Sequence, residues 1–270
     1  MKIPSVAFTL IALVTLWGIS RTARAQIFVT NSGAGTISEY TTSGVPVNPT
    51  LVTGLTLPWG LAVSGGNLFV TDLTGGTIGE YTSLGAPVDR DLIRGLLGPR
   101  GVAASRGNLF VASDNPRSES SRVGKYTISG APVNPALIQR DFFGFVEGVA
   151  VSRNKLFVAD LNSDLVAEYT TSGALVNPTL IRGLSGPTGI AVSEGHLFVT
   201  NFRDGTISEY DAATGAPINP ALVSGLNGPF AIAVSGGNLF VTSQVFDQDT
   251  GVVGKYTISG ETVDAALVSG

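Results

Sequence analysis

The chain has 270 residues, of which 43% are hydrophobic, 13% are charged and 35 are glycine. This composition suits a compact protein with many turns and argues against disorder. The formal net charge of −4 argues against a nucleic-acid partner, and the lack of cysteine excludes disulfides, thiolate nucleophiles and Cys-ligated zinc.

Residues 1–25 have the layout of a secretory signal peptide. Lys2 gives a positive start, residues 6–19 form a mostly apolar run, and Ala23 and Ala25 are small residues at the positions read during cleavage. The alternative is an N-terminal membrane anchor, but the run is short for a span of roughly 20 residues. We therefore expect cleavage near Ala25, a single domain over 26–270 without a membrane span, and a secreted or periplasmic location.

The rest of the chain repeats one unit. The motif [IL]-F-V recurs at intervals of 41, 41, 47, 41 and 42 residues, at Phe28, Phe69, Phe110, Phe157, Phe198 and Phe240. In the second unit, β-branched and aromatic residues fill four runs, at 60–64, 67–71, 77–82 and 86–95. Four short strands in a repeat of about 41 residues predict an all-β fold, a β-propeller of six blades.

Two of these stretches resemble a known group of repeats. VTNSGAGTISEY (29–40) and VTNFRDGTISEYDAATG (199–215) look like the NHL and YVTN propeller repeats of secreted bacterial proteins. The resemblance covers everything after residue 25. It implies a propeller but no single activity, because those families combine binding, scaffolding and enzymatic roles. Most NHL-type repeats end the second strand with Asp, and Ser113 and Ser243 depart from that pattern.

The innermost strand of the blade is represented only five times. Its GxAV-type pattern occurs at 60–63, 101–104, 148–151, 189–192 and 231–234, whereas the first unit begins at its second strand. We therefore expect one blade to lack its innermost strand. Either the ring closes with a three-stranded blade, or the sequence stops short of the natural end, and we favour the second alternative.

Insertions single out one face of the predicted ring. The spacing from the Phe of the second strand to the Tyr of the third is 12 residues in four units and 16 in units three and six. Most added length falls on the face where strand two meets strand three, and insertions on one face of a repeat array often mark the binding face. The alternative for the insertions is recent duplication of a group of blades followed by drift, and the alternative for the residues before the first strands is ordinary variation at exposed loop positions. We expect the binding surface to include Trp59, Arg100, Glu147, Thr188, Phe230, Arg117, Arg122 and Phe246.

Aspartates near the same loops are weak candidates for a Ca²⁺ site: Asp72, Asp114, Asp160 and Asp247. The simpler interpretation is that Asp at a strand end bonds back to the turn backbone. The single histidine, His196, lies in a turn on the opposite face, where four other units have Asn or Lys. We predict an exposed turn residue there, and we expect neither a His-ligated metal nor a Ser-His-Asp triad.

The residue before the Tyr of each third strand is a Glu or a Lys, at Glu39, Glu80, Lys125, Glu168, Glu209 and Lys255. Because the charge changes sign between units, we predict that these side chains are solvated.

The sequence as a whole favours a monomeric binding or scaffold module without a cofactor. Its loop face would recognise a protein, a peptide or a glycan. The alternative is a hydrolase or lyase whose metal is held by carboxylates, and we assign no catalytic residue. A third hypothesis, a structural surface-layer component, is supported only by the YVTN resemblance.

Overall fold

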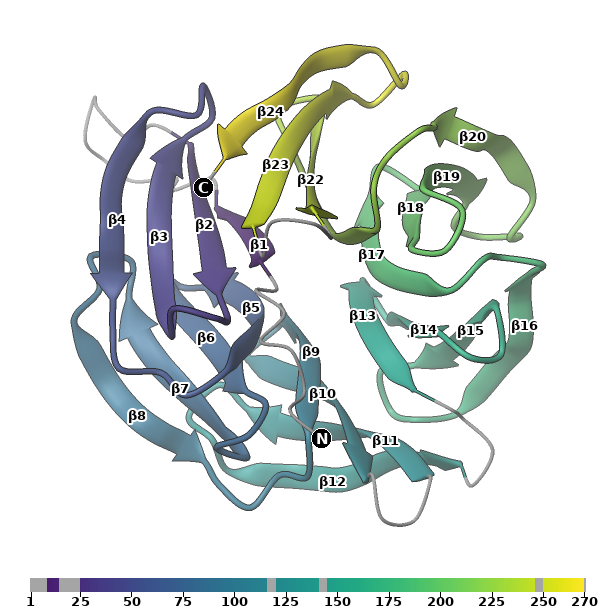
Figure 1. The fold of residues 1–270 in the computed structure, drawn as a ribbon. Helices are drawn as coiled ribbons and strands as arrows, with labels where there is room; N and C mark the ends of the chain where they lie inside the picture. The colour runs from purple at the N-terminus through teal and green to yellow at the C-terminus, as the bar shows by residue number, and fades with distance from the viewer. Residues whose placement is uncertain (1–8, 15–24, 116–119, 141–144, 246–249, 270) are drawn as a thin grey trace, which may run out of the picture.

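The computed structural model describes residues 9–14, 25–115, 120–140, 145–245 and 250–269, and within these ranges it has strands and no α-helix. No helix in this part of the chain could therefore cross a membrane. The strands form six antiparallel sheets of four strands each. Figure 1 shows the sheets arranged as blades around a central axis, with the last blade beside the first.

The inner half of each blade is made of two strands that are apolar almost throughout. The innermost strands are β1 (Thr9–Val14), β5 (Pro58–Ser64), β9 (Pro99–Ser105), β13 (Val146–Ser152), β17 (Pro187–Ser193) and β21 (Pro229–Ser235). The second strands are β2 (Gln26–Asn31), β6 (Asn67–Asp72), β10 (Asn108–Asn115), β14 (Lys155–Asp160), β18 (His196–Asn201) and β22 (Asn238–Val245). Both faces of such strands are buried between neighbouring blades.

The outer half of each blade is more polar. The third strands are β3 (Thr36–Thr41), β7 (Thr77–Thr82), β11 (Ser120–Thr127), β15 (Leu165–Thr170), β19 (Thr206–Asp211) and β23 (Thr250–Thr257). The fourth strands are β4 (Pro46–Val52), β8 (Pro87–Ile93), β12 (Pro132–Arg140), β16 (Leu175–Arg182), β20 (Pro217–Val223) and β24 (Thr262–Ser269). The predicted six-bladed all-β propeller is therefore confirmed.

Tight hairpins join the first strand of a blade to the second. In the second blade, Ser64 pairs with Asn67, which leaves Gly65 and Gly66 as a two-residue turn. Both glycines have positive φ, 61° and 83°, as a type I′ turn requires. This turn explains why the spacing between the first two strands does not change from unit to unit.

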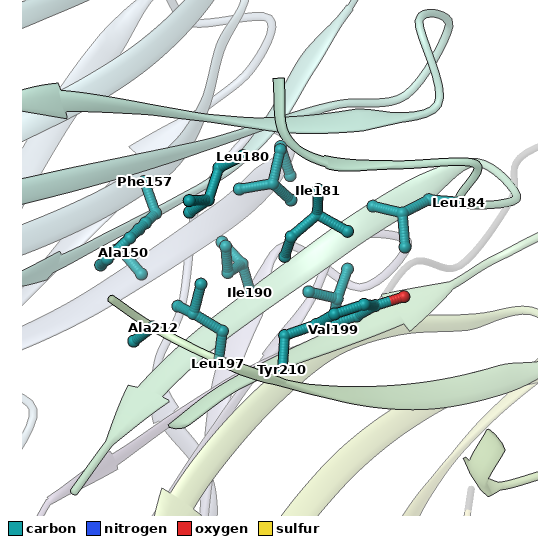
Figure 2. Packing of buried hydrophobic residues seen from close by; sticks show 12 residues of the cluster. Ala150, Phe157, Leu180, Ile181, Leu184, Ile190, Leu197, Val199, Tyr210 and Ala212 are labelled. Atoms are coloured by element: carbon teal, nitrogen blue, oxygen red, sulfur yellow. The ribbon is translucent and has the colours of Figure 1, made fainter. Parts of the chain in front are cut away.

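The cores lie between blades rather than within them. Figure 2 shows one such core, where Ala150, Phe157 and Ile181 of the fourth blade pack against Ile190 and Leu197 of the fifth. Burial of apolar side chains on both sides of each junction supplies the main cohesion of the ring. Innermost strands of adjacent blades also contact each other at every junction, including β1 with β5 and β1 with β21.

The expectation that one blade lacks its innermost strand was wrong. In the first blade that position is taken by β1, which pairs antiparallel with β2 from Thr9 opposite Asn31 to Val14 opposite Gln26. The strand comes from the segment that we interpreted as a signal peptide. An apolar run is compatible with both roles, so the pattern alone did not distinguish them.

The prediction that the Glu and Lys of the third strands are solvated was wrong for three of the six. Glu39, Glu168 and Glu209 are buried. Each buried carboxylate has a partner at the start of the neighbouring second strand, and the partners are Gln26, Lys155 and His196. Lys125 donates to the Thr171 carbonyl of the next blade at 3.1 Å, and Lys255 donates to the Thr42 carbonyl at 3.2 Å. The charge varies because the partners vary, not because the site is exposed.

Candidate functional site at the channel mouth

The second residue of each innermost strand lies at one end of the central channel. These residues are Trp59, Arg100, Glu147, Thr188 and Phe230, in β5, β9, β13, β17 and β21. The five strands run in the same direction along the axis, so equivalent positions reach the same end. The side chains vary from blade to blade while the strand beneath them keeps its pattern, and several of them meet directly.

An ion group connects the third and fourth blades at this end. Arg100 Nη1 lies 2.5 Å from Glu147 Oε1, and Arg100 Nε lies 2.5 Å from Asp114 Oδ2. The Trp59 indole donates to Glu147 Oε2 at 3.4 Å, from the second blade across the channel. Asp114 also accepts hydrogen bonds from the Ser121 hydroxyl and the Val146 amide. One guanidinium therefore serves two buried carboxylates.

Burial shifts the proton affinity of both acids. Burial raises the pKa of Glu147 to about 7, partly offset by Arg100 and reinforced by the nearby Asp114 carboxylate. The pKa of Asp114 is also raised, mainly by burial, against the hydrogen bond from Ser121 and the charge of Arg100. Perturbed carboxylates in a water-poor site are a frequent feature of functional sites, although structural ion networks show them as well.

Aromatic side chains surround the ion group. Trp59 and Phe230 meet edge to face with ring centroids 5.4 Å apart, and Phe202 meets Phe230 in the same way at 6.2 Å. The Arg100 guanidinium carbon lies 5.5 Å from the Trp59 ring centroid and 5.2 Å from that of Phe145. Stacking of this kind favours a weakly hydrated guanidinium. Beneath this layer the inner strands line a cavity of about 90 Å³.

Not every predicted residue belongs to this group. Thr188 is only 2% exposed, and its hydroxyl bonds to Thr200 and the Pro229 carbonyl, so it ties blades five and six together. Arg122 lies in β11 opposite Ser113, and none of its described contacts joins it to the ion group. Arg117 and Phe246 lie outside the described residues.

Sequence reasoning missed two aromatics and the role of one acid. Phe145 directly precedes β13, and Phe202 directly follows β18. Both lie in loops of variable composition, where repeat alignment gave no signal. Asp114 was expected to bond to the turn backbone or, as a weak candidate, to hold a metal, whereas it contacts Arg100. The available clue was that Asp114 directly follows Ser113, the residue that replaces the usual Asp of the repeat.

The other aspartate candidates hold turns together. Asp72 accepts from the amides of Thr56, Leu57 and Gly75. Asp160 accepts from the amides of Asn162 and Ser163. These bonds match the simpler interpretation of strand-end Asp residues. Asp247 lies outside the described residues, and within the described ones no three His, Asp or Glu side chains converge as metal ligands would.

His196 lies on the opposite face, as its place in the first-to-second-strand turn predicts. Its side chain is half-buried rather than fully exposed, because Nδ1 lies 2.7 Å from Glu209 Oε1 and the ring stacks on Phe198. It borders a cavity of about 360 Å³ between blades five and six, which Gly236, Gly237 and Ile258 also line.

These features define a six-bladed β-propeller with a polar and aromatic layer at one end of its channel. The fold is shared with structures of different roles. A nidogen structure solved in a nidogen/laminin complex is 20% identical with a TM-score of 0.63, and the match covers 72% of this chain and 74% of that chain. A gluconolactonase from Xanthomonas campestris is 14% identical with a TM-score of 0.66, over 82% of this chain and 80% of that one.

A virginiamycin B lyase from Staphylococcus aureus is 15% identical with a TM-score of 0.58, over 96% of this chain and 89% of that one. At these identities the similarity shows the fold alone. The sequence matches no model of a known protein family and no curated protein. Among fold neighbours, both binding proteins and enzymes are present, so function has to be argued from the site.

Proposed function

We propose that the protein is an extracytoplasmic binding module whose channel mouth and surrounding loops recognise a protein or peptide ligand. The observation that carries the proposal is the Arg100 group, a guanidinium held between Glu147 and Asp114 and flanked by Trp59 and Phe145. Trp59 is only 5% exposed and the Arg100 side chain 16%, so this group would hold the exposed Phe145 in place for the ligand rather than supply the contact area itself. The extracytoplasmic location rests on the signal-peptide pattern of residues 1–25.

The exposed groups near the mouth favour a protein or peptide over a glycan. Phe145 and Leu97 are large apolar side chains exposed on the loops that lead into β13 and β9. The acids beneath them are already bonded to Arg100, so the described part of the mouth offers apolar contact area more than free polar groups. A glycan would need several outward hydrogen-bonding groups around an aromatic platform.

The competing hydrolase or lyase hypothesis has less support. It needs several carboxylates converging on one metal, and the described candidates are committed to turns or to Arg100. The hydrolase or lyase hypothesis is retained because two structures with a similar fold are a gluconolactonase and a lyase.

Binding screens with matched variants would test the proposal. The full chain would be screened against random peptide and glycan libraries, and hits measured by calorimetry with and without Ca²⁺. Phe145→Ser and Leu97→Ser are expected to weaken a genuine peptide ligand about tenfold or more. Leu84→Ser, at a side chain 87% exposed outside the mouth, is the control and should change nothing. Glycan hits, Ca²⁺-dependent turnover, or hits unaffected by the mouth variants would each contradict the proposal.

A further inference from the structure

The position filled by β1 differs from the other five innermost positions. Each of the other five strands pairs with its second strand through a register shift near its third residue, as between Pro58 and Leu61 in the second blade. β1 pairs with β2 in unbroken register over its whole length. The occupant of the first blade therefore follows a different backbone path from its five counterparts.

The register shift brings neighbouring innermost strands close together. It brings a small residue of one innermost strand against the backbone of the next blade: a Cβ on Gly60 would lie 2.2 Å from the Arg100 carbonyl oxygen, and one on Gly148 would lie 2.3 Å from that of Thr188. Contacts this short exclude any side chain unless the backbones move apart. Four of the five counterparts carry glycine at this place, at Gly60, Gly101, Gly148 and Gly189. The fifth, Ala231, lies in β21, whose neighbour is β1, and it does carry a Cβ.

The sequence of β1 does not meet that requirement. Ile11 pairs with Val29 in the first blade as Leu61 pairs with Val70 in the second, which aligns Leu10 with Gly60. The residue of β1 at this position is therefore not glycine, and the β1 backbone keeps an unbroken register where its counterparts shift. β1 therefore occupies the innermost position of the first blade as a strand, but it lacks the glycine and the register shift found in the innermost strand of the second blade.

Threonine hydroxyls of the second strands link the innermost strands of adjacent blades. Thr71 accepts from the Gly60 amide of its own blade at 2.6 Å and donates to the Arg100 carbonyl of the next at 2.7 Å. Thr200 repeats this between Gly189 and Phe230, at 2.7 and 2.8 Å.

Thr242 occupies the same position in the sixth blade. It accepts from the Ala231 amide at 2.9 Å, and among the described residues its buried hydroxyl has no acceptor in the first blade. The equivalent carbonyl would belong to an innermost strand on the shifted path.

We propose that the innermost position of the first blade is an acceptor site for an extended peptide of the repeat's own inner-strand chemistry, Pro-x-Gly followed by an apolar residue and Ala-Val-Ser, carried by a partner. The peptide would add to the edge of β2 by main-chain hydrogen bonds, as in β-strand addition. Its glycine would pass beneath the Trp59 carbonyl, and its preceding carbonyl would accept from Thr242. In the full chain β1 fills the site as an exchangeable occupant, and cleavage near Ala25 would leave the site open. This site, the edge of β2, is distinct from the exposed loops at the channel mouth, although one end of the added strand would lie beside Trp59 in β5.

The probe is a labelled synthetic peptide with the sequence of residues 185–193, SGPTGIAVS. A matched peptide carrying Gly189→Leu is the control. We expect the probe to bind the full chain at least about tenfold more tightly than the control, because a leucine side chain at this position would overlap the neighbouring carbonyl, as a Cβ on Gly60 or Gly148 would. In the chain, Thr242→Val should weaken the probe roughly fivefold by removing one buried hydrogen bond. Equal binding of the two peptides, or no effect at Thr242, would overturn the proposal.

Competition with β1 gives a second readout. Ile11→Pro in the full chain disrupts β1 pairing and should strengthen probe binding at least about tenfold, since an attached strand competes at high effective concentration. If this variant folds only when the probe is present, that complementation also supports the proposal. In the unaltered chain, saturating probe should raise deuterium uptake of residues 9–14 while residues 26–31 stay protected. Unchanged uptake in both segments, together with no binding to the variant, would refute it.

Discussion

Arg100 and Glu147 face each other across the junction of the third and fourth blades, with Nη1 2.5 Å from Oε1. The same guanidinium reaches Asp114, so two buried acids depend on one cation. Buried ion pairs contribute little net stability relative to apolar packing, but removing one member leaves an uncompensated charge. Because loss of Arg100 would leave two buried acids without their cation, we expect replacement of Arg100 to destabilise the fold more than replacement of any other residue of the channel mouth.

Replacing this cation should destabilise the fold. Arg100→Met keeps much of the side-chain volume but leaves Glu147 and Asp114 without their partner, and we expect the free energy of unfolding to fall by about 3–5 kcal/mol at neutral pH. Arg94→Met is the matched control, because Arg94 pairs with Asp91 at an exposed site, where such pairs contribute at most about 1 kcal/mol. Urea denaturation followed by tryptophan fluorescence measures both, and similar losses in the two variants would contradict the prediction.

Glu147 should give the protein a stability that falls as pH rises. Its folded-state pKa is about 7 against an ordinary 4.5. Between these values the folded chain binds more protons than the unfolded chain, so the free energy of unfolding decreases with rising pH, by up to about 3 kcal/mol. Asp114 adds a change of the same sign at lower pH, because its pKa is also raised.

The variant Glu147→Gln should flatten that dependence. Its free energy of unfolding, measured by urea denaturation at pH 5 and pH 8, is expected to change less between the two conditions than that of the unaltered chain. Asp91→Asn, in the exposed pair with Arg94, is expected to leave the pH dependence as it is. Parallel curves for the unaltered chain and Glu147→Gln would mean that Glu147 does not titrate in this range.

The fold was predictable because the same pattern of strands and turns recurs in every unit of the repeat. Each unit repeats the apolar run around a residue such as Phe69 and the turn at Gly65 and Gly66, and local rules assign strands to the runs and hairpins to the turns. β1 was not predictable, because its apolar run has no glycine where Gly60 stands in the next unit. Nothing in its pattern marks it as an innermost strand.

The channel mouth was predictable only in part. Equivalent positions of a ring must converge, which placed Trp59, Arg100 and Phe230 at one end. Phe145 and Phe202 come from loops, where the repeat imposes no pattern. Sign variation was misread as exposure at Glu209, because a buried carboxylate is acceptable when a local partner such as His196 compensates it.

Close approach of innermost strands predicts a strong effect at Gly148. In Gly148→Ala the new Cβ would lie 2.3 Å from the Thr188 carbonyl oxygen unless the backbones separate. We expect a loss of about 1–3 kcal/mol in the free energy of unfolding, as for other overpacked sites. Ala231→Gly, at the equivalent position of the sixth blade, is the control and should cost about 0.5–1 kcal/mol through backbone entropy. A neutral Gly148→Ala would show that the junction between blades four and five is loosely packed.

Two substitutions at His196 separate two explanations of how this residue stabilises the fold. If His196 matters because it bonds to the buried Glu209 carboxylate, His196→Ala should cost about 1–3 kcal/mol by leaving that carboxylate without its partner. His196→Asn should cost about 0.5 kcal/mol or less, because Asn67 makes the equivalent bond to Glu80 at 2.6 Å in the second blade. Thermal and urea denaturation measure both variants. Equal losses would instead assign the stabilisation to stacking of the imidazole on Phe198, which neither replacement preserves.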